Sequence, residues 1–115
     1  MTLRRWQEVP PPTVDEFVGG PGLALLEFWA GWSGASFLVG AAVERVARSR
    51  TDLPLRVGRV DSDAHPEVCA RFRAPAPPVL VLFRDGEVIA RHSGLITVDT
   101  LSSWLDGALA GSEAP

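Results

Sequence analysis

Short apolar runs alternate with segments of helical periodicity along this chain, and the alternation restricts its fold more than any other feature. The run Leu23–Trp29 follows a Gly/Pro-rich turn and has the length of a strand buried on both faces. In residues 34–50 the apolar positions recur at helical spacing, with Leu38 and Val39 on the side that we expect to face a sheet. These two segments predict a strand followed by an amphipathic helix.

The second half of the chain continues this order. A strand is predicted at 55–60, and residues 61–66 supply a turn and a helix start for a short helix ending at Phe72. Prolines between 75 and 78 end that helix. Strands at 79–83 and 88–93 flank an Asp-Gly hairpin turn, and Thr97 can cap a last helix that reaches Leu109. A strand at 6–9 and a short helix at 14–17 complete the set.

This element order predicts an α/β fold with a mixed sheet. Strand-helix alternation favours parallel strands covered by helices, and the closing hairpin adds antiparallel strands. A length of 115 residues suits one domain, 1–115, because a second core would be too small. We expect residues 1–10 to form a strand and a connector, and residues 111–115 to form a frayed tail.

Composition excludes several function classes. A net charge of -3 supplies no positive field for nucleic acid. No apolar run is long enough to cross a membrane, no secretory signal is visible, and nothing predicts a metal site or another cofactor. The single cysteine, Cys69, cannot form an intrachain disulfide and is expected to be a small buried residue. A cytoplasmic location follows as the expectation.

One segment carries a family resemblance. Residues 28–36 read Phe-Trp-Ala-Gly-Trp-Ser-Gly-Ala-Ser, which resembles the thioredoxin active-site segment Phe-Trp-Ala-x-Trp-Cys-Gly-Pro-Cys. Residues 61–66 resemble the turn after the third thioredoxin strand, residues 78–87 the cis-proline strand and hairpin, and Gly94 a family glycine before the last helix. The resemblance implies a thioredoxin fold over nearly the whole chain, with four to five strands and helices on both sheet faces.

The two redox positions of that family carry Ser33 and Ser36 here. Family chemistry needs a thiolate with a lowered pKa and a second thiol, and a serine hydroxyl supplies neither. We expect Ser33 to cap the following helix. Neither His65 nor His92 is placed by its spacing to activate a serine, so a hydrolase is disfavoured and no catalytic residue is predicted.

Two charged residues fall at further family positions. Glu27 stands where the family has a buried aspartate that handles a cysteine proton, and Arg59 where it has a nearby lysine. Without a thiol, we interpret them as relict groups that form a semi-buried ion pair. Pro78 aligns with the cis-proline, and Pro77 before it has no N–H for strand-like substrate binding.

An apolar face should surround the missing thiols. Its predicted members are Trp32, Ala35, Phe37, Pro77, Pro78 and Leu95. Apolar clusters of this kind mark protein contacts, although Trp32 and Phe37 could instead fold back onto the domain. Trp29 and Trp104 belong to apolar faces and are expected in the core.

Two functional hypotheses remain open. The first is a redox-inactive thioredoxin-like protein that binds a protein or peptide partner as an accessory, assembly or chaperone-like module. The alternative is a thiol-disulfide oxidoreductase represented by an engineered variant, whose two active-site cysteines have been exchanged deliberately for serine, the near-isosteric choice. Five further positions depart from the family pattern: Glu27, Ala35, Phe37, Ala41 and Pro77. These departures favour the first hypothesis, because an exchange of cysteines for serines requires none of them. The sequence leaves the oligomeric state open.

Overall fold

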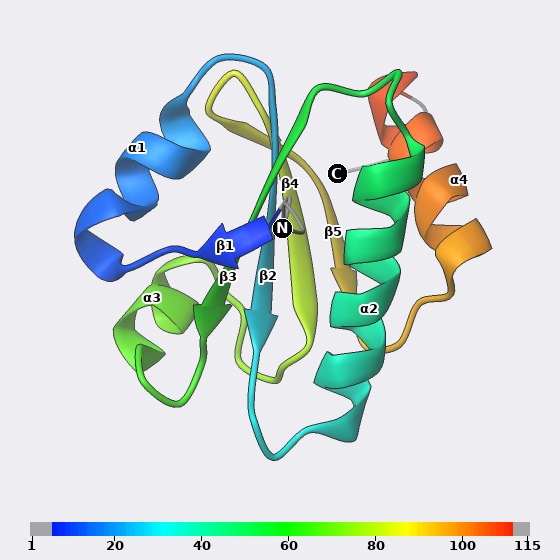
Figure 1. The fold of residues 1–115 in the computed structure, drawn as a ribbon. Coiled ribbons are helices and arrows are strands. Elements are labelled where there is room, and N and C mark those ends of the chain that lie inside the picture. Colours follow the sequence, from blue (N-terminus) through cyan, green and yellow to red (C-terminus); the bar gives the residue numbers. More distant parts are fainter. Residues whose placement is uncertain (1–5, 112–115) are drawn as a thin grey trace, which may run out of the picture.

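A five-stranded sheet forms the centre of the protein, in the order β1-β3-β2-β4-β5 (Figure 1). The computed structural model describes residues 6–111. The strands are β1 Trp6–Glu8, β2 Leu23–Trp29, β3 Leu55–Asp61, β4 Val79–Arg84 and β5 Glu87–Ser93. The helices are η1 Pro11–Thr13 (a 3-10 turn), α1 Val14–Gly19, α2 Gly34–Ser49, α3 Pro66–Arg71 and α4 Val98–Leu109.

Strand directions bring several loops to one edge of the sheet. β1, β3 and β2 run parallel, whereas β4 is antiparallel to β2 and to β5. The register pairs Phe28 with Val79, and Val79 with Ser93. The ends of β2, β3 and β5 therefore meet the beginning of β4. The loops that follow or precede these points gather at that end of the molecule.

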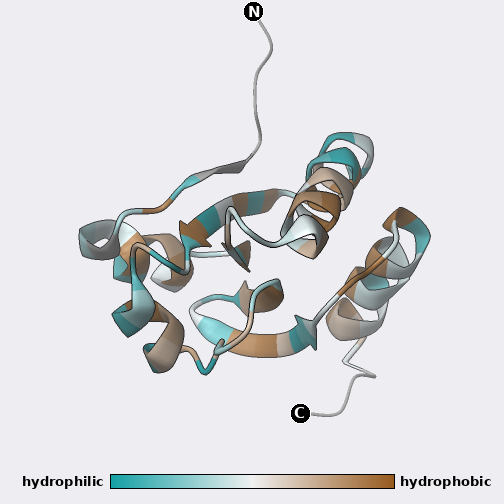
Figure 2. Cartoon of the chain, turned by 90° about the horizontal axis from the view of Figure 1, so that it is seen from below, coloured by the Kyte–Doolittle hydropathy of each residue, from teal (hydrophilic) through white to brown (hydrophobic). Residues whose placement is uncertain are grey.

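Helices cover both faces of the sheet. α2 and α4 lie on one face, where Val39, Val43 and Leu101 belong to a buried cluster with alternate residues of the strands. α1 and α3 lie on the other, where Val14 and Val68 belong to a second cluster. Figure 2, seen from below, shows the two groups of helices with hydrophobic segments of the strands between them. β2 is central to the sheet, so its first six residues are buried.

The predicted α/β fold, with a mixed sheet and helices on both faces, is confirmed. Element bounds differ by one or two residues: α2 ends at Ser49 and β3 continues to Asp61. Residues 11–13 follow the segment 1–10 that was expected to end in a connector, and they make a 3-10 turn before α1. The predictions for residues 1–5 and 112–115 lie outside the described part of the chain.

Three burial predictions were wrong. Leu38, expected to face the sheet, is 64% exposed. Successive helix residues turn by about 100°, so Leu38 lies outside the buried side of α2, which includes Val39 and Val43. Trp29 and Trp104 are only partly buried, because Trp29 ends its strand at the sheet edge and Trp104 borders the α4 side of the core.

Candidate functional site

The candidate site lies at the sheet edge where β2, β3 and β5 end and β4 begins. The amide N–H of Ser62 donates to the carbonyl of Trp29 at 2.8 Å, which joins the loops after β3 and β2. The amide N–H of Gly94 donates to the carbonyl of Pro78 at 2.9 Å, which joins the loops after β5 and before β4. Backbone hydrogen bonds thus connect the segments that carry the predicted site residues.

Ser33 and Ser36 both hold the backbone of this edge in place. The Ser33 hydroxyl accepts from the amide N–H of Ser36 at 3.1 Å and caps α2, as expected from the sequence. The Ser36 hydroxyl is completely buried and accepts from the amide N–H of Ala30 at 3.2 Å. The Ser33 oxygen therefore satisfies an amide of the first turn of α2, and the Ser36 oxygen satisfies the amide of Ala30 just after β2.

The two histidines contact other groups. The Nδ1 atom of His65 lies 3.9 Å from Oε2 of Glu67, and Nε2 of His92 lies 3.0 Å from the carbonyl oxygen of Leu95. His65, in the loop after β3, thus lies at the same end of the sheet as Ser33, but the contact of its ring is with Glu67. These contacts give the serines no general base.

Glu27 and Arg59 form the semi-buried ion pair that the sequence predicted. They are register partners on β2 and β3, and Nε of Arg59 lies 3.6 Å from Oε1 of Glu27. Glu27 is 2% exposed, and its Oε2 atom has no hydrogen-bond partner among the described residues. Burial raises the pKa of Glu27 to about 7, opposed by the charge of Arg59 and assisted by that of Glu8.

Trp29 and Glu8 extend this pair across the sheet. The Arg59 guanidinium lies 4.4 Å from the centre of the Trp29 ring, within cation–π range. The indole Nε1 of Trp29 donates to Oε1 of Glu8 at 2.9 Å, and Glu8 is the register partner of Arg59 on β1. Arg59 on β3 therefore lies between two carboxylates, that of Glu27 on β2 and that of Glu8 on β1. These charged groups extend across three adjacent strands.

Gly40 of α2 is a site residue that the sequence reasoning missed. A Cβ atom at this position would lie 3.2 Å from Nη2 of Arg59 and 3.5 Å from Oε1 of Glu27. The absence of a side chain therefore lets the ion pair approach the helix backbone. A glycine inside a helical pattern was the available signal for such a close approach.

The residues predicted for an apolar face differ in their exposure. Trp32 is 71% exposed, Phe37 58% and Leu95 61%, so these side chains point outward instead of folding into the core. Ala35 and Pro77 are half-buried. Pro78 is buried, and its peptide bond to Pro77 is cis. Pro78 therefore supports the surface from beneath and offers little area to a partner.

Trp32 keeps a defined position despite its exposure. Its indole Nε1 donates to Oδ1 of Asp63 at 3.1 Å, and Asp63 belongs to the loop after β3. The Asp61 carboxylate in turn accepts from the amide N–H groups of Asp63 and Ala64, which fixes that loop. The loop after β3 thus orients the largest side chain of the face.

Comparisons with known proteins decide the family. The thioredoxin family model matches residues 13–107. The chain belongs to the thioredoxin family. Thioredoxin 1 of Synechococcus elongatus is 30% identical over 82 residues, which cover 71% of this chain and 76% of that protein. Thioredoxin of Mycobacterium tuberculosis is 38% identical over 71 residues, covering 61% of this chain and 60% of that protein.

A plant thioredoxin is also similar to this chain. Thioredoxin X, a chloroplastic protein of Arabidopsis thaliana, is 34% identical over 87 residues. Those residues cover 74% of this chain and 47% of the plant protein, so the chain spans about half the length of that relative. Members of the thioredoxin family bind protein substrates, and this chain shares the family fold.

The thioredoxin redox positions contain no sulfur in this family member. The one cysteine, Cys69, lies buried in α3, as predicted. Within residues 6–111, His, Cys, Asp and Glu form no cluster of three or more suited to a metal ion. The same described residues include no helix with the length and apolarity that crossing a membrane demands.

Proposed function

We propose that this thioredoxin-family protein binds a partner polypeptide without exchanging a disulfide with it, as an accessory, assembly or chaperone-like module. The observation that carries the proposal is the pair of hydroxyl groups at the redox positions. Ser33 and Ser36 each accept a hydrogen bond from a backbone N–H. Neither oxygen can form the mixed disulfide through which thiol exchange proceeds. Recognition by surface contacts is the activity that this site retains.

Three exposed side chains form the proposed contact area. Trp32, Phe37 and Leu95 supply a rigid indole, a phenyl ring and an aliphatic side chain. Aromatic side chains contribute a large part of the energy of protein interfaces, and they do so best where their position is fixed in advance. The hydrogen bond from Trp32 to Asp63 supports such a role for the indole.

Pro77 alters how a partner strand can bind beside this area. A proline has no N–H, so the residue before the cis peptide bond offers only its carbonyl to an extended chain. Side-chain contacts then carry more of the affinity than backbone pairing would. The missing N–H at Pro77 therefore favours a partner that binds through a folded surface or through an apolar segment.

The proposal has a direct test in two assays. The purified protein should not reduce the disulfides of insulin with dithiothreitol as the electron donor. Immobilised on beads, it should retain a partner from the cytoplasmic fraction of its host, and Trp32→Ala or Phe37→Ala should abolish retention. Val88→Ala is the matched control, because Val88 is also exposed but lies at the opposite end of the sheet. Retention unaffected by both aromatic substitutions would remove this face from the proposal.

One observation favours a second candidate, a thiol-disulfide oxidoreductase whose active-site cysteines have been replaced by serine through engineering. The matched relatives are named thioredoxins. Under this hypothesis, Ser33→Cys together with Ser36→Cys restores insulin reduction at an ordinary rate. A double variant that forms its disulfide but stays inactive would exclude the candidate. The source gene also separates the two hypotheses, since only the second requires cysteine codons there.

A reducing compartment suits both candidates. The chain contains one cysteine and thus gains nothing from an oxidising environment. We therefore place the proposed activity in the cytoplasm. Fractionation of host cells with an antibody against the protein tests this location.

A further inference from the structure

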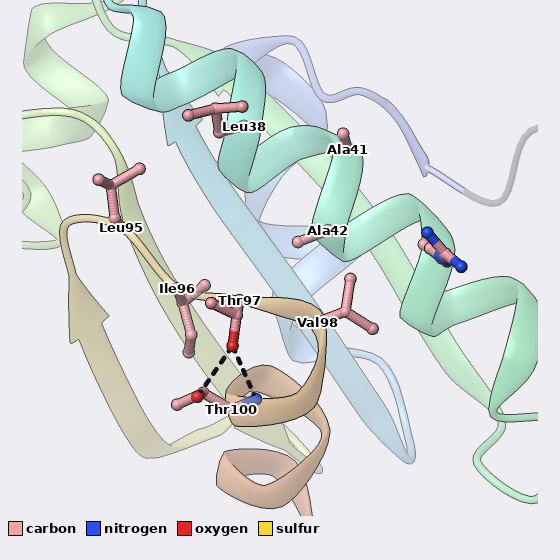
Figure 3. A pocket seen from close by; sticks show the side chains of 9 residues that line it. Leu38, Ala41, Ala42, Leu95, Ile96, Thr97, Val98 and Thr100 are labelled. Carbon is pink, nitrogen blue, oxygen red and sulfur yellow. Dashed lines mark hydrogen bonds between the residues drawn. The ribbon is translucent and has the colours of Figure 1, made fainter.

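A groove of about 550 Å³ runs between α2 and the segment that joins β5 to α4 (Figure 3). Leu38, Ala41, Ala42 and Arg45 line it from α2, and residues 95–98 and Thr100 line it from the other side. Leu95 belongs both to this groove and to the proposed contact face. The two surfaces are therefore continuous at Leu95.

The α2 wall is a single stripe along the helix. Positions 38, 41, 42 and 45 have the spacing i, i+3, i+4, i+7, which brings them to one side of the helix. This stripe lies beside the one that faces the sheet, and it leaves Leu38 64% exposed. Seven helical steps cover about 10 Å, which is room for two or three side chains of a bound segment.

The opposite wall is apolar and offers few free hydrogen bonds. Figure 3 shows Leu95, Ile96 and Val98 lining this wall opposite the helix. The Thr97 hydroxyl donates to Oγ1 of Thr100 at 2.9 Å and accepts from the amide N–H of Thr100 at 3.2 Å. Thr97 and Thr100 thus form hydrogen bonds mainly with each other at the start of α4, so apolar contacts dominate this wall.

Arg45 supplies the charge of the groove. It is the only charged residue among the described residues that line this groove, and it is exposed. The neighbouring Arg48, by contrast, is paired with Glu44 one turn earlier. A positive group at the end of an apolar groove is complementary to a segment in which apolar side chains lie next to a carboxylate.

We propose that this groove binds a short acidic-apolar segment of a partner polypeptide, with its apolar side chains between Leu38 and Val98 and its carboxylate on Arg45. The inference deepens the proposed function, because it gives the same partner a second contact area and a stated chemistry. Trp32 and Phe37 would anchor one part of the partner, and the groove would select the adjoining sequence.

Random peptides of about a dozen residues, displayed on phage and selected on the purified protein, provide the probe. We expect selected peptides with two apolar residues next to an Asp or Glu, in either chain direction. Ala41→Arg, which fills the groove from an exposed position, should weaken their binding by roughly tenfold or more, and Arg45→Glu should do the same. Replacing the peptide carboxylate by Lys should restore binding to Arg45→Glu but not to the unaltered protein. Arg48→Glu is the matched control and should change binding little.

The outcomes separate this inference from the proposed function. An empty selection, peptides without a carboxylate, or peptides indifferent to Ala41→Arg and Arg45→Glu would overturn the groove assignment. Partner retention lost with Trp32→Ala but kept with Ala41→Arg would likewise remove the groove and leave the proposed function in place. A third outcome combines two results: Lys-containing peptides bind Arg45→Glu, and Trp32→Ala and Phe37→Ala still retain the partner. That outcome would support the groove and refute the aromatic face. Thermal unfolding of each variant verifies that it is folded.

Discussion

The backbone of Gly40 in α2 faces the carboxylate of Glu27 in β2. A Cβ atom on Gly40 would lie 3.5 Å from Oε1 and 3.6 Å from Oε2 of Glu27. The glycine therefore makes room for a long buried acid beneath the helix, and Arg59 occupies the remaining space beside it. A helix position and a strand position are thus coupled through a charged group instead of through apolar packing.

Replacement of Gly40 by leucine should destabilise the fold. The larger side chain displaces Glu27 and Arg59 from each other, at a cost of roughly 1–3 kcal/mol in the free energy of unfolding. Urea titration followed by circular dichroism measures this loss. Gly34→Ala is the matched control, because a Cβ there meets nothing within 4 Å. Equal stability of the two variants would refute the close approach.

Glu27 should make stability fall as pH rises between about 4.5 and 7. Burial raises its folded-state pKa to about 7 from the ordinary 4.5, so the folded state holds a proton that the unfolded chain has lost. This contribution is complete below pH 4.5 and is lost as pH rises through 7, amounting to roughly 3 kcal/mol. Unfolding free energies from urea titrations at several pH values give the slope.

Glu27→Gln should remove most of that slope, because an amide does not titrate in this range. Below pH 7 the protonated Glu27 already presents a neutral group to Arg59, as the amide of the variant does at every pH. The slope, not the absolute stability, is the relevant quantity. Glu87→Gln, at the exposed start of β5, is the control for replacing a glutamate by glutamine. A Glu27→Gln protein whose stability keeps the original pH dependence would show that Glu27 is not the source of the slope.

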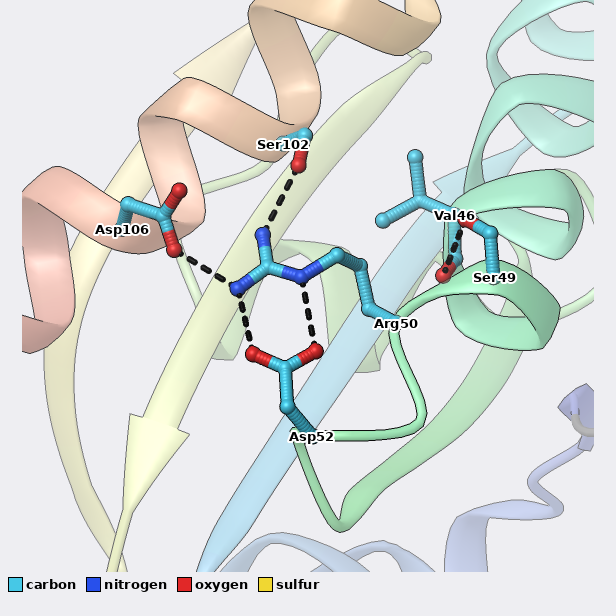
Figure 4. A network of polar contacts seen from close by, with 6 residues as sticks. All are labelled: Val46, Ser49, Arg50, Asp52, Ser102 and Asp106. Carbon is cyan, nitrogen blue, oxygen red and sulfur yellow. Dashed lines mark hydrogen bonds and ion pairs between the residues drawn. The ribbon is translucent and has the colours of Figure 1, made fainter.

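Arg50 should contribute to stability by joining α2 to α4 (Figure 4). Its guanidinium donates to both carboxylate oxygens of Asp52, to Asp106 at 2.7 Å and to the Ser102 hydroxyl at 2.8 Å. Arg50→Met should lower the thermal midpoint by a few degrees because these bonds form one network. Arg48→Met, which removes a single exposed pair, should lower it less. The reverse order would argue against a network.

The two serines should differ in their structural cost. Ser36→Ala leaves the buried N–H of Ala30 without its acceptor and should cost roughly 1–3 kcal/mol. Ser33→Ala removes the α2 cap and should cost about 1 kcal/mol. Ser103→Ala, on the exposed side of α4, is the control and should be close to neutral. Chemical denaturation of the three variants gives the order.

Much of the fold was predictable because its signals are local. The apolar runs at β2 and β4, the hairpin turn and the period of α2 each depend on neighbouring residues. The pairing of Glu27 with Arg59 was also predicted, through the family resemblance. The burial of Pro78 and the exposure of Leu38 were not, because each depends on elements that lie far away in the chain.

By itself the sequence determined the order of strands and helices, the cap at Ser33, and the absence of a second cysteine. These follow from residue type and spacing alone. Only the tertiary structure decided that Gly40 accommodates Glu27, that Trp32 is oriented by Asp63, and that Arg45 ends an apolar groove. The physical reason is that periodicity shows which side of an element is apolar. Packing between distant segments decides which neighbours cover that side and which part stays open to a partner.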